Sequence, residues 1–132
     1  MAAQRKYLRP GKLSTFFNAA AIRLGFASSL TIRGRRSGQP REVAVQPIEV
    51  AGQRYLVGAR GETEWVRNLR AAGEGELRKG GKTERIRATE LTGEEQASIA
   101  RAYRDQLGKQ VSGYFEKLPD PADHPVFRIE PM

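Results

Sequence analysis

Short runs of alternating apolar and polar residues, separated by turn residues, constrain the possible folds of this chain more than any other feature of its sequence. They predict strands over residues 28–33, 42–50, 53–59, 76–79, 82–91 and 126–130. In the second run the apolar positions change parity at Pro47, which predicts an edge, a bulge or a sharp bend because proline cannot donate a ladder hydrogen bond. Gly80-Gly81 predicts a hairpin between the fourth and fifth runs.

Helical patterns are few. They predict an amphipathic helix over residues 14–25, a short helix over Glu64–Ala72 with Thr63 as N-cap, a helix opened by the capping box Thr92-Gly93-Glu94-Glu95, and a broken segment over residues 108–121. Strands with so few connecting helices pair mostly antiparallel, and such a sheet hides its edges by curling. We therefore expect a mainly β fold with flanking helices (α+β), in which six to seven mostly antiparallel strands form a small barrel.

Composition removes several classes of function. Residues 1–132 are expected to form one domain, which begins with a basic segment over residues 1–12 whose flexibility is left open. The chain has no cysteine and one histidine, His124, which excludes thiol catalysis and His-dependent triads, and we expect no metal site. The net charge of +8 indicates an anionic partner, such as nucleic acid, an acidic membrane surface or an anionic cofactor. A cytoplasmic location is expected, because no apolar run could span a bilayer.

The arginine loop, residues 34–41, concentrates positive charge beyond the first predicted strand. With the preceding residue it holds four arginines and no acid, namely Arg33, Arg35, Arg36 and Arg41. Gly34 and Gly38 permit positive φ, so backbone amides can converge on a ligand, and guanidinium groups match phosphate and carboxylate oxygens. We interpret the loop as an anion-binding site; a solvated hairpin tip is the alternative.

Three segments together carry a family resemblance. They are Thr31-Ile32-Arg33-Gly34-Arg35-Arg36-Ser37-Gly38-Gln39-Pro40-Arg41, then Tyr55-Leu56-Val57-Gly58-Ala59-Arg60-Gly61, then Trp65 with Asn68-Leu69-Arg70. In these motifs the chain resembles the deazaflavin-dependent nitroreductase family over about residues 13–130. The resemblance implies a split β-barrel related to FMN-binding barrels. It also implies use of the reduced deazaflavin coenzyme F-420 to reduce quinones, nitroaromatics and other activated alkenes.

The resemblance also implies a set of coenzyme-binding residues. They are Arg35, Arg36, Ser37, Gly38, Gln39, Arg41, Val43, Ala44, Val45, Gly58, Ala59, Arg60, Gly61, Trp65 and Asn68. In this comparison Arg36 and Arg41 would hold the phosphate and the acidic oligoglutamate tail. Trp65 and Asn68 would brace residues 58–61, which face the arginine loop.

The chain departs from the family pattern near the expected acceptor. The segment between Ala59 and Trp65 is shorter than in typical members, and Arg60 stands where a small or hydroxyl residue is often found. Tyr114 is the one tyrosine in the C-terminal lid region, and we predict that it is the catalytic residue, orienting the acceptor or giving it a proton. Because the coenzyme itself carries the hydride, the protein need not supply a nucleophile or a metal.

The sequence therefore predicts an oxidoreductase that transfers a hydride from reduced F-420 to a small planar apolar acceptor, such as a quinone, nitroaromatic or enone. The alternatives are a coenzyme- or ligand-binding split barrel without efficient turnover, and an FMN-binding relative. A nucleic-acid partner is disfavoured, because the aromatic residues occur in apolar patterns rather than interleaved with basic ones. A peripheral membrane contact and a homodimer are left open.

Overall fold

A computed structural model describes residues 28–132; the helix predicted over residues 14–25 and the basic segment 1–12 lie outside this range. The described part contains the strands β1 (Ser28–Arg33), β2 (Pro40–Val45), β3 (Ile48–Val50), β4 (Gln53–Val57), β5 (Glu74–Lys79), β6 (Lys82–Glu90) and β7 (Val126–Pro131). Its α-helices are α2 (Glu64–Ala72), α3 (Gly93–Leu107) and α4 (Ser112–Lys117), with 3₁₀ turns at Gly108–Gln110 and Pro121–Asp123.

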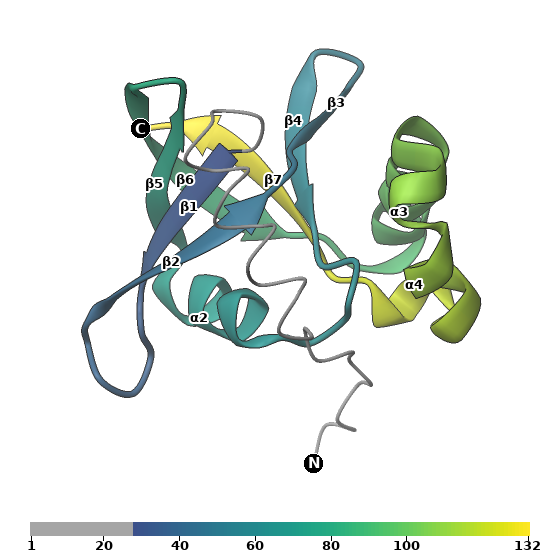
Figure 1. The fold of residues 1–132 in the computed structure, drawn as a ribbon, viewed down its shortest axis with the longest axis horizontal. Helices are drawn as coiled ribbons and strands as arrows, with labels where there is room; N and C mark the ends of the chain where they lie inside the picture. Colours follow the sequence, from purple (N-terminus) through teal and green to yellow (C-terminus); the bar gives the residue numbers. More distant parts are fainter. Residues whose placement is uncertain (1–27) are drawn as a thin grey trace.

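The seven strands form one antiparallel sheet in the order β2-β1-β5-β6-β7-β4-β3. This sheet curls into a half-barrel, and its two edge strands, β2 and β3, are joined through Gln46 and Pro47 (Figure 1). Pro47 therefore marks the sharp bend that the parity change predicts, where the chain passes from one edge strand to the other. The predicted split barrel with flanking helices is confirmed.

Strand bounds differ from the prediction where pairing rather than local pattern decides them. The run predicted over residues 42–50 divides at Pro47 into β2 and β3, and β2 begins earlier, at Pro40, which pairs with Arg33 at the end of the edge strand. Likewise β5 begins at Glu74, which pairs with Arg87 across the hairpin. Cross-strand partners of this kind are invisible in a local sequence pattern.

The N-cap residues of α2 and α3 were predicted correctly, but the expected side-chain capping hydrogen bonds are not formed. Thr63 and Thr92 occupy the N-cap positions of α2 and α3, yet neither side chain makes a capping hydrogen bond, so the predicted capping box is wrong. Gly93, directly after Thr92, has a φ of 65°, which turns the backbone out of the geometry that the box requires. The start of α3 is instead fixed by Gln96, whose side-chain amide donates to the carbonyls of Pro121 and His124, each at 2.7 Å.

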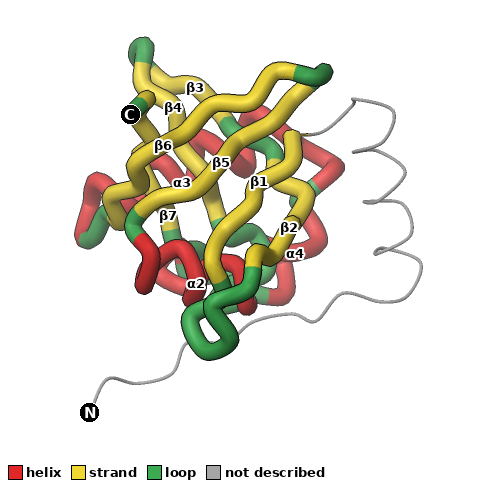
Figure 2. The backbone as a smooth tube through the Cα atoms, turned by 90° about the vertical axis from the view of Figure 1, so that its left-hand side faces the viewer, coloured by secondary structure: helices red, strands yellow, loops and turns green. Residues whose placement is uncertain are grey.

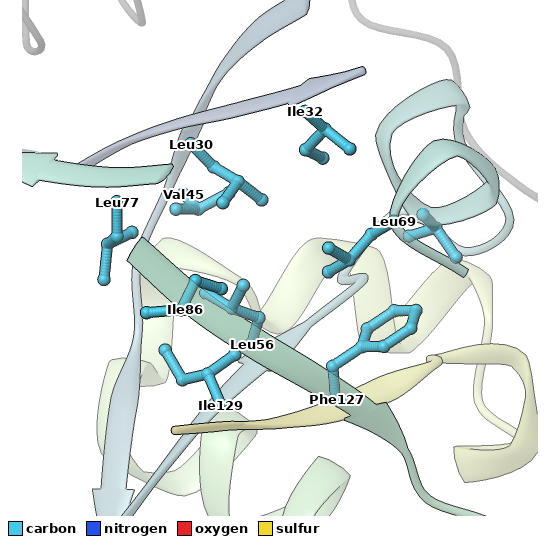
Figure 3. Close-up of a cluster of buried hydrophobic side chains, with 10 residues drawn as sticks. Leu30, Ile32, Val45, Leu56, Leu69, Leu77, Ile86, Phe127 and Ile129 are labelled. Carbon is cyan, nitrogen blue, oxygen red and sulfur yellow. The ribbon is translucent and has the colours of Figure 1, made fainter. Parts of the chain in front are cut away.

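Two apolar clusters hold the described part together. The first fills the half-barrel and consists of Leu30, Ile32, Val45, Leu56, Val66, Leu69, Leu77, Ile86, Phe127 and Ile129 (Figure 3). The second lies between α3, α4 and the outer side of the sheet, and includes Tyr55, Val57, Ile99, Tyr103, Phe115 and Val126. The helix α2 closes one end of the barrel, where Val66 and Leu69 are fully buried (Figure 1). The arginine loop lies at this same end, beside α2 (Figure 2).

His124 has a structural place in the second cluster. It is fully buried, its ring stacks on Phe115 at 3.9 Å between centroids, and its Nε2 lies 2.6 Å from the carbonyl of Leu118. This packing ties the turn before β7 to α4. No helix within residues 28–132 is long and apolar enough to cross a membrane.

Candidate functional site

The arginine loop is closed by its own backbone. Gly34 donates to the carbonyl of Gln39 at 2.8 Å, and Gly38 donates back to the carbonyl of Gly34 at 2.9 Å. Gly38 has the predicted positive φ, 73°, but Gly34 does not. Gly34 is required for space instead, because a Cβ there would lie 2.9 Å from Ser37 Oγ and 3.2 Å from the Gln39 carbonyl. The last two residues of the loop belong to β2.

Arg35 connects this loop to α2. Its backbone N–H and its Nη1 both donate to Asn68 Oδ1, at 3.1 and 2.8 Å, and the same Nη1 pairs with Glu64 at 2.7 Å. The bond from Arg35 holds the pKa of Glu64 below its ordinary value, so this carboxylate stays ionised. Asn68 therefore braces the arginine loop, and its expected role in bracing residues 58–61 stays a prediction.

Arg36 and Arg41 are the available cations of the loop. Both side chains are exposed, and within residues 28–132 neither makes a hydrogen bond or an ion pair, in contrast to Arg35. The charge of Arg36 helps to lower the pKa of Glu64, which places it close to the N-terminal turn of α2. Two guanidinium groups are thus positioned to meet an external anion.

These residues border a cavity of about 780 Å³, here called the main cavity. Its walls come from β1, β2, the arginine loop, α2 and the loop that precedes α2. The lining residues are Ile32, Gly34, Arg35, Arg36, Ser37, Arg41, Glu42, Val43, Arg60, Thr63, Glu64, Trp65 and Asn68. Charged groups from the arginine loop and apolar side chains from β2 and α2 therefore face the same space, as expected for a site that binds an apolar ring with an anionic tail.

The facing loop, residues 58–63, forms the opposite wall and has its own anchors. Gly58 donates to the carbonyl of Pro125 at 2.8 Å. Further along, Glu62 pairs with Arg70 at 2.9 Å, and Arg70 in turn pairs with Glu90 at 2.6 Å. Hydrogen bonds to Glu90 and Glu62 raise the pKa of Arg70 further above its ordinary value, so the group is a permanent cation.

Two polar atoms of the facing loop are buried with neither a hydrogen bond nor an ion pair among the described residues, whereas the buried Glu62 Oε2 has its ion pair with Arg70. They are Arg60 Nη1 and Thr63 Oγ1, both on residues that line the main cavity. A buried hydroxyl or guanidinium group that lacks a hydrogen bond costs free energy, and such groups in proteins are usually satisfied. Because both residues line the main cavity, Thr63, predicted only as an N-cap, becomes a candidate site residue that the sequence interpretation missed.

A second hollow of about 180 Å³, the small cavity, lies beyond Arg60 and Trp65, which line both spaces. Its lining residues are Ala44, Val45, Gln46, Leu56, Val57, Ala59, Arg60, Trp65, Tyr103 and Tyr114. Burial, and then the neighbouring Tyr114, raise the pKa of Tyr103 to about 12, so this phenol stays protonated at neutral pH. In the sequence, Tyr103 shares a helix face with Ile99 and Leu107, and nothing in this local pattern distinguishes it from a core residue.

The predicted coenzyme residues thus divide between two cavities. The main cavity is lined by Arg35, Arg36, Ser37, Arg41, Val43, Arg60, Trp65 and Asn68. The small cavity is lined by Ala44, Val45 and Ala59, together with the predicted catalytic Tyr114. Gly38, Gln39, Gly58 and Gly61 line neither of these cavities. At Gly58 a Cβ would lie 2.9 Å from the carbonyl oxygen of Gly61, so this glycine allows a close backbone approach.

The curled antiparallel sheet, the arginine loop and the paired cavities define a split β-barrel protein built for an anionic ligand with an apolar body. The sequence profile of the F-420H(2)-dependent quinone reductase family matches residues 18–117, and the chain belongs to that family. It is therefore a deazaflavin-dependent reductase whose cofactor is coenzyme F-420.

Solved structures agree with this fold. One described as an F-420-H2 dependent reductase (FDR-A) shares 25% identity with a TM-score of 0.61, covering 78% of this chain and 92% of its own. A second, described as a domain-swapped dimer, shares 25% identity with a TM-score of 0.53 and 78% coverage of each chain. HutZ, the heme storage protein from Vibrio cholerae, has a TM-score of 0.61 at 12% identity, with 86% of this chain and 87% of that one covered, which shows likeness of fold alone. No curated protein is significantly similar in sequence.

Proposed function

We propose that the main cavity holds coenzyme F-420 with its phosphate and acidic tail on Arg36 and Arg41, and that a quinone-like acceptor enters from the side of the small cavity. The observation that carries this proposal is the meeting of three features at one cavity: two exposed arginines that make no hydrogen bond or ion pair within residues 28–132, the orphaned Thr63 Oγ1, and the apolar wall of Val43 and Trp65. The residues present therefore fit the coenzyme.

When bound in its reduced form, the coenzyme supplies the hydride. The chain has three other tasks. The arginines fix the anionic tail, the apolar wall orients a flat ring and limits water, and the Thr63 hydroxyl, which has no hydrogen-bond partner within residues 28–132, borders the same cavity. None of these tasks requires a nucleophile or a metal, which suits a chain without cysteine and with its single histidine buried.

Tyr114 is our proposed proton donor to the acceptor. It lines the small cavity beside Tyr103 and borders the same space as Arg60 and Trp65. Its phenol O–H can donate a hydrogen bond or a proton to an oxygen of the acceptor. The acceptor class we favour is a quinone, with nitroaromatics and enones as further compounds to test.

The heme-binding structures of similar fold do not lead us to a heme function. His124 is the only histidine of the chain; it is fully buried, and its Nε2 is engaged with the Leu118 carbonyl at 2.6 Å, so it is not placed to ligate a heme iron. A cytoplasmic location, a peripheral membrane contact and a homodimer stay predictions. The domain-swapped dimer among the similar structures supports testing the oligomeric state by light scattering.

Turnover provides the test of the proposed acceptor. Purified protein is mixed with reduced F-420, and reoxidation of the coenzyme is followed with quinones, nitroaromatics and enones. We expect turnover with at least one quinone, and a lower rate with unchanged coenzyme affinity in Tyr114→Phe. Coenzyme binding without reduction of any compound in the panel would favour the binding-protein alternative, whereas an unaffected Tyr114→Phe rate would remove only the role of that residue.

A further inference from the structure

The small cavity is chemically different from the main one. Its lining residues include Arg60, Tyr103 and Tyr114, and none of its described lining residues is acidic. The main cavity, by contrast, includes Glu42 and Glu64, which pair with Arg78 and Arg35. The small cavity therefore presents one cation and two hydroxyl donors without a protein anion.

Arg60 is the unusual member of this group. Its Nη1 is buried, with no hydrogen-bond partner among residues 28–132, although many other arginines of the described chain are paired with a carboxylate. Removing a charged group from water is costly unless an opposite charge or a good acceptor meets it. Arg60 lines both cavities, so its side chain borders the space for an acceptor molecule as well as the space for the coenzyme.

We propose that the small cavity is a subsite for an ionised oxygen of the electron acceptor, with Arg60 as its counter-ion and Tyr103 and Tyr114 as hydrogen-bond donors. The substrate class is then a quinone or enone that carries an acidic group, such as a hydroxyquinone. This inference rests on the proposed function and moves Arg60 from the predicted coenzyme set to the acceptor.

Size and donor chemistry fit such a group. A space of about 180 Å³ is close to the volume that encloses one six-membered ring, so one ring of a hydroxyquinone can enter while the rest extends toward the main cavity. Tyr103 has a phenol that is protonated at neutral pH and can only donate to an anionic oxygen. An anion held by Arg60 would therefore satisfy the orphaned guanidinium and meet two further donors.

The same arrangement suits the reaction. A quinone becomes a hydroquinone by a net gain of one hydride and one proton. The hydride forms a C–H bond at a ring carbon conjugated with a carbonyl, the C=C π pair shifts toward that carbonyl, and the carbonyl π pair moves onto oxygen, which takes a proton from a phenol that solvent reprotonates. The ring carbon then loses a proton and the second carbonyl oxygen gains one, which gives the hydroquinone. The hydride is the one that the reduced coenzyme supplies, so the quinone is reduced and the coenzyme oxidised. The arriving electron pair increases the negative charge on the acceptor, and a guanidinium fixed beside its ionised oxygen stabilises that charge.

The test compares two ligands that differ in charge and by one methyl group. Lawsone, a hydroxynaphthoquinone that is anionic at neutral pH, and its uncharged methyl ether are titrated into the full-length protein by calorimetry. Saturating oxidised F-420 is present, because it cannot donate a hydride and leaves the ligand unreduced. The variants are Arg60→Met, Arg60→Lys and, as a control with the same change in net charge, Arg87→Met on the exposed surface of β6. Coenzyme affinity is measured separately for each protein.

We expect the wild type to bind lawsone more tightly than the ether, and Arg60→Met to lose roughly 10- to 100-fold in lawsone affinity while ether and coenzyme affinities stay unchanged. Arg60→Lys should retain part of the preference, and Arg87→Met all of it. Equal binding of the two ligands by the wild type would overturn the subsite, as would a loss of coenzyme rather than lawsone affinity in Arg60→Met. A wild type that binds lawsone but not the coenzyme would instead refute the proposed function and leave this subsite standing.

Discussion

Replacement of Asn68 by alanine should loosen the arginine loop from α2 and lower the stability of the whole domain. Asn68 Oδ1 accepts two hydrogen bonds from Arg35, one from the backbone at 3.1 Å and one from the guanidinium at 2.8 Å. A neutral bond contributes about 0.5–1.5 kcal/mol and a bond to a charged group about 1.5–3 kcal/mol. Because the guanidinium keeps its contact to Glu64 at 2.7 Å, we expect a loss near the lower end of the sum, about 2–3 kcal/mol.

Urea unfolding followed by circular dichroism measures this loss directly, and a thermal scan should show Tm falling by roughly 8–12 °C. The matched control is Asn68→Asp, which keeps an oxygen acceptor for both Arg35 donors and should stay within about 1 kcal/mol of the wild type. Asn68→Ala should also weaken F-420 binding, because the arginine loop would lose its anchor. A wild-type unfolding midpoint in Asn68→Ala, or equal losses in the two variants, would refute the reasoning.

Three further predictions concern the framework around the cavities. Gly58→Ala should lower the free energy of unfolding by about 1–3 kcal/mol in urea titration, because its Cβ would meet the Gly61 carbonyl at 2.9 Å; an unchanged midpoint would contradict this. Absorbance at the tyrosinate band, followed against pH, should show a phenol that titrates near pH 12 in the wild type and is missing from Tyr103→Phe. Since the folded-state pKa lies above the ordinary 10, wild-type stability should fall between pH 10 and 12, and the variant should lose less. His124→Phe keeps the stacking but loses the contact to the Leu118 carbonyl, and we expect a loss of about 1–2 kcal/mol, checked by the same unfolding assay.

The sequence predicted the fold well where local pattern and tertiary structure agree. The bounds of β1 and α2 match the prediction, and Pro47 bends the chain between the two edge strands. The prediction of a capping box at Thr92 was wrong, because the motif is defined by residue types whereas its hydrogen bonds depend on backbone angles such as the φ of Gly93. The start of β5 depended on a cross-strand partner, which no local pattern contains.

The sequence predicted the position of the candidate site but not the long-range contacts of its residues. A dense run of arginines is visible in sequence, but which arginine is available is not: Arg35 is committed to Asn68, and this long-range contact leaves Arg36 and Arg41 for a ligand. Thr63 and Tyr103 were missed because each also fits an ordinary structural role, as an N-cap or a core residue. Only burial without a partner, or a shared cavity wall, separates the two roles.

The most direct measurement of the central claim is a fluorescence titration of the protein with oxidised F-420 and, separately, with FMN, repeated for the Arg36→Ala/Arg41→Ala double variant at low and high salt. The account predicts tighter binding of F-420 than of FMN, because the acidic tail offers more charges to the two arginines. It also predicts a loss of roughly 100-fold for F-420 in the double variant, and a smaller loss at high salt because exposed charge pairs are screened. Equal or tighter FMN binding, or normal F-420 affinity of the double variant at low salt, would contradict the account.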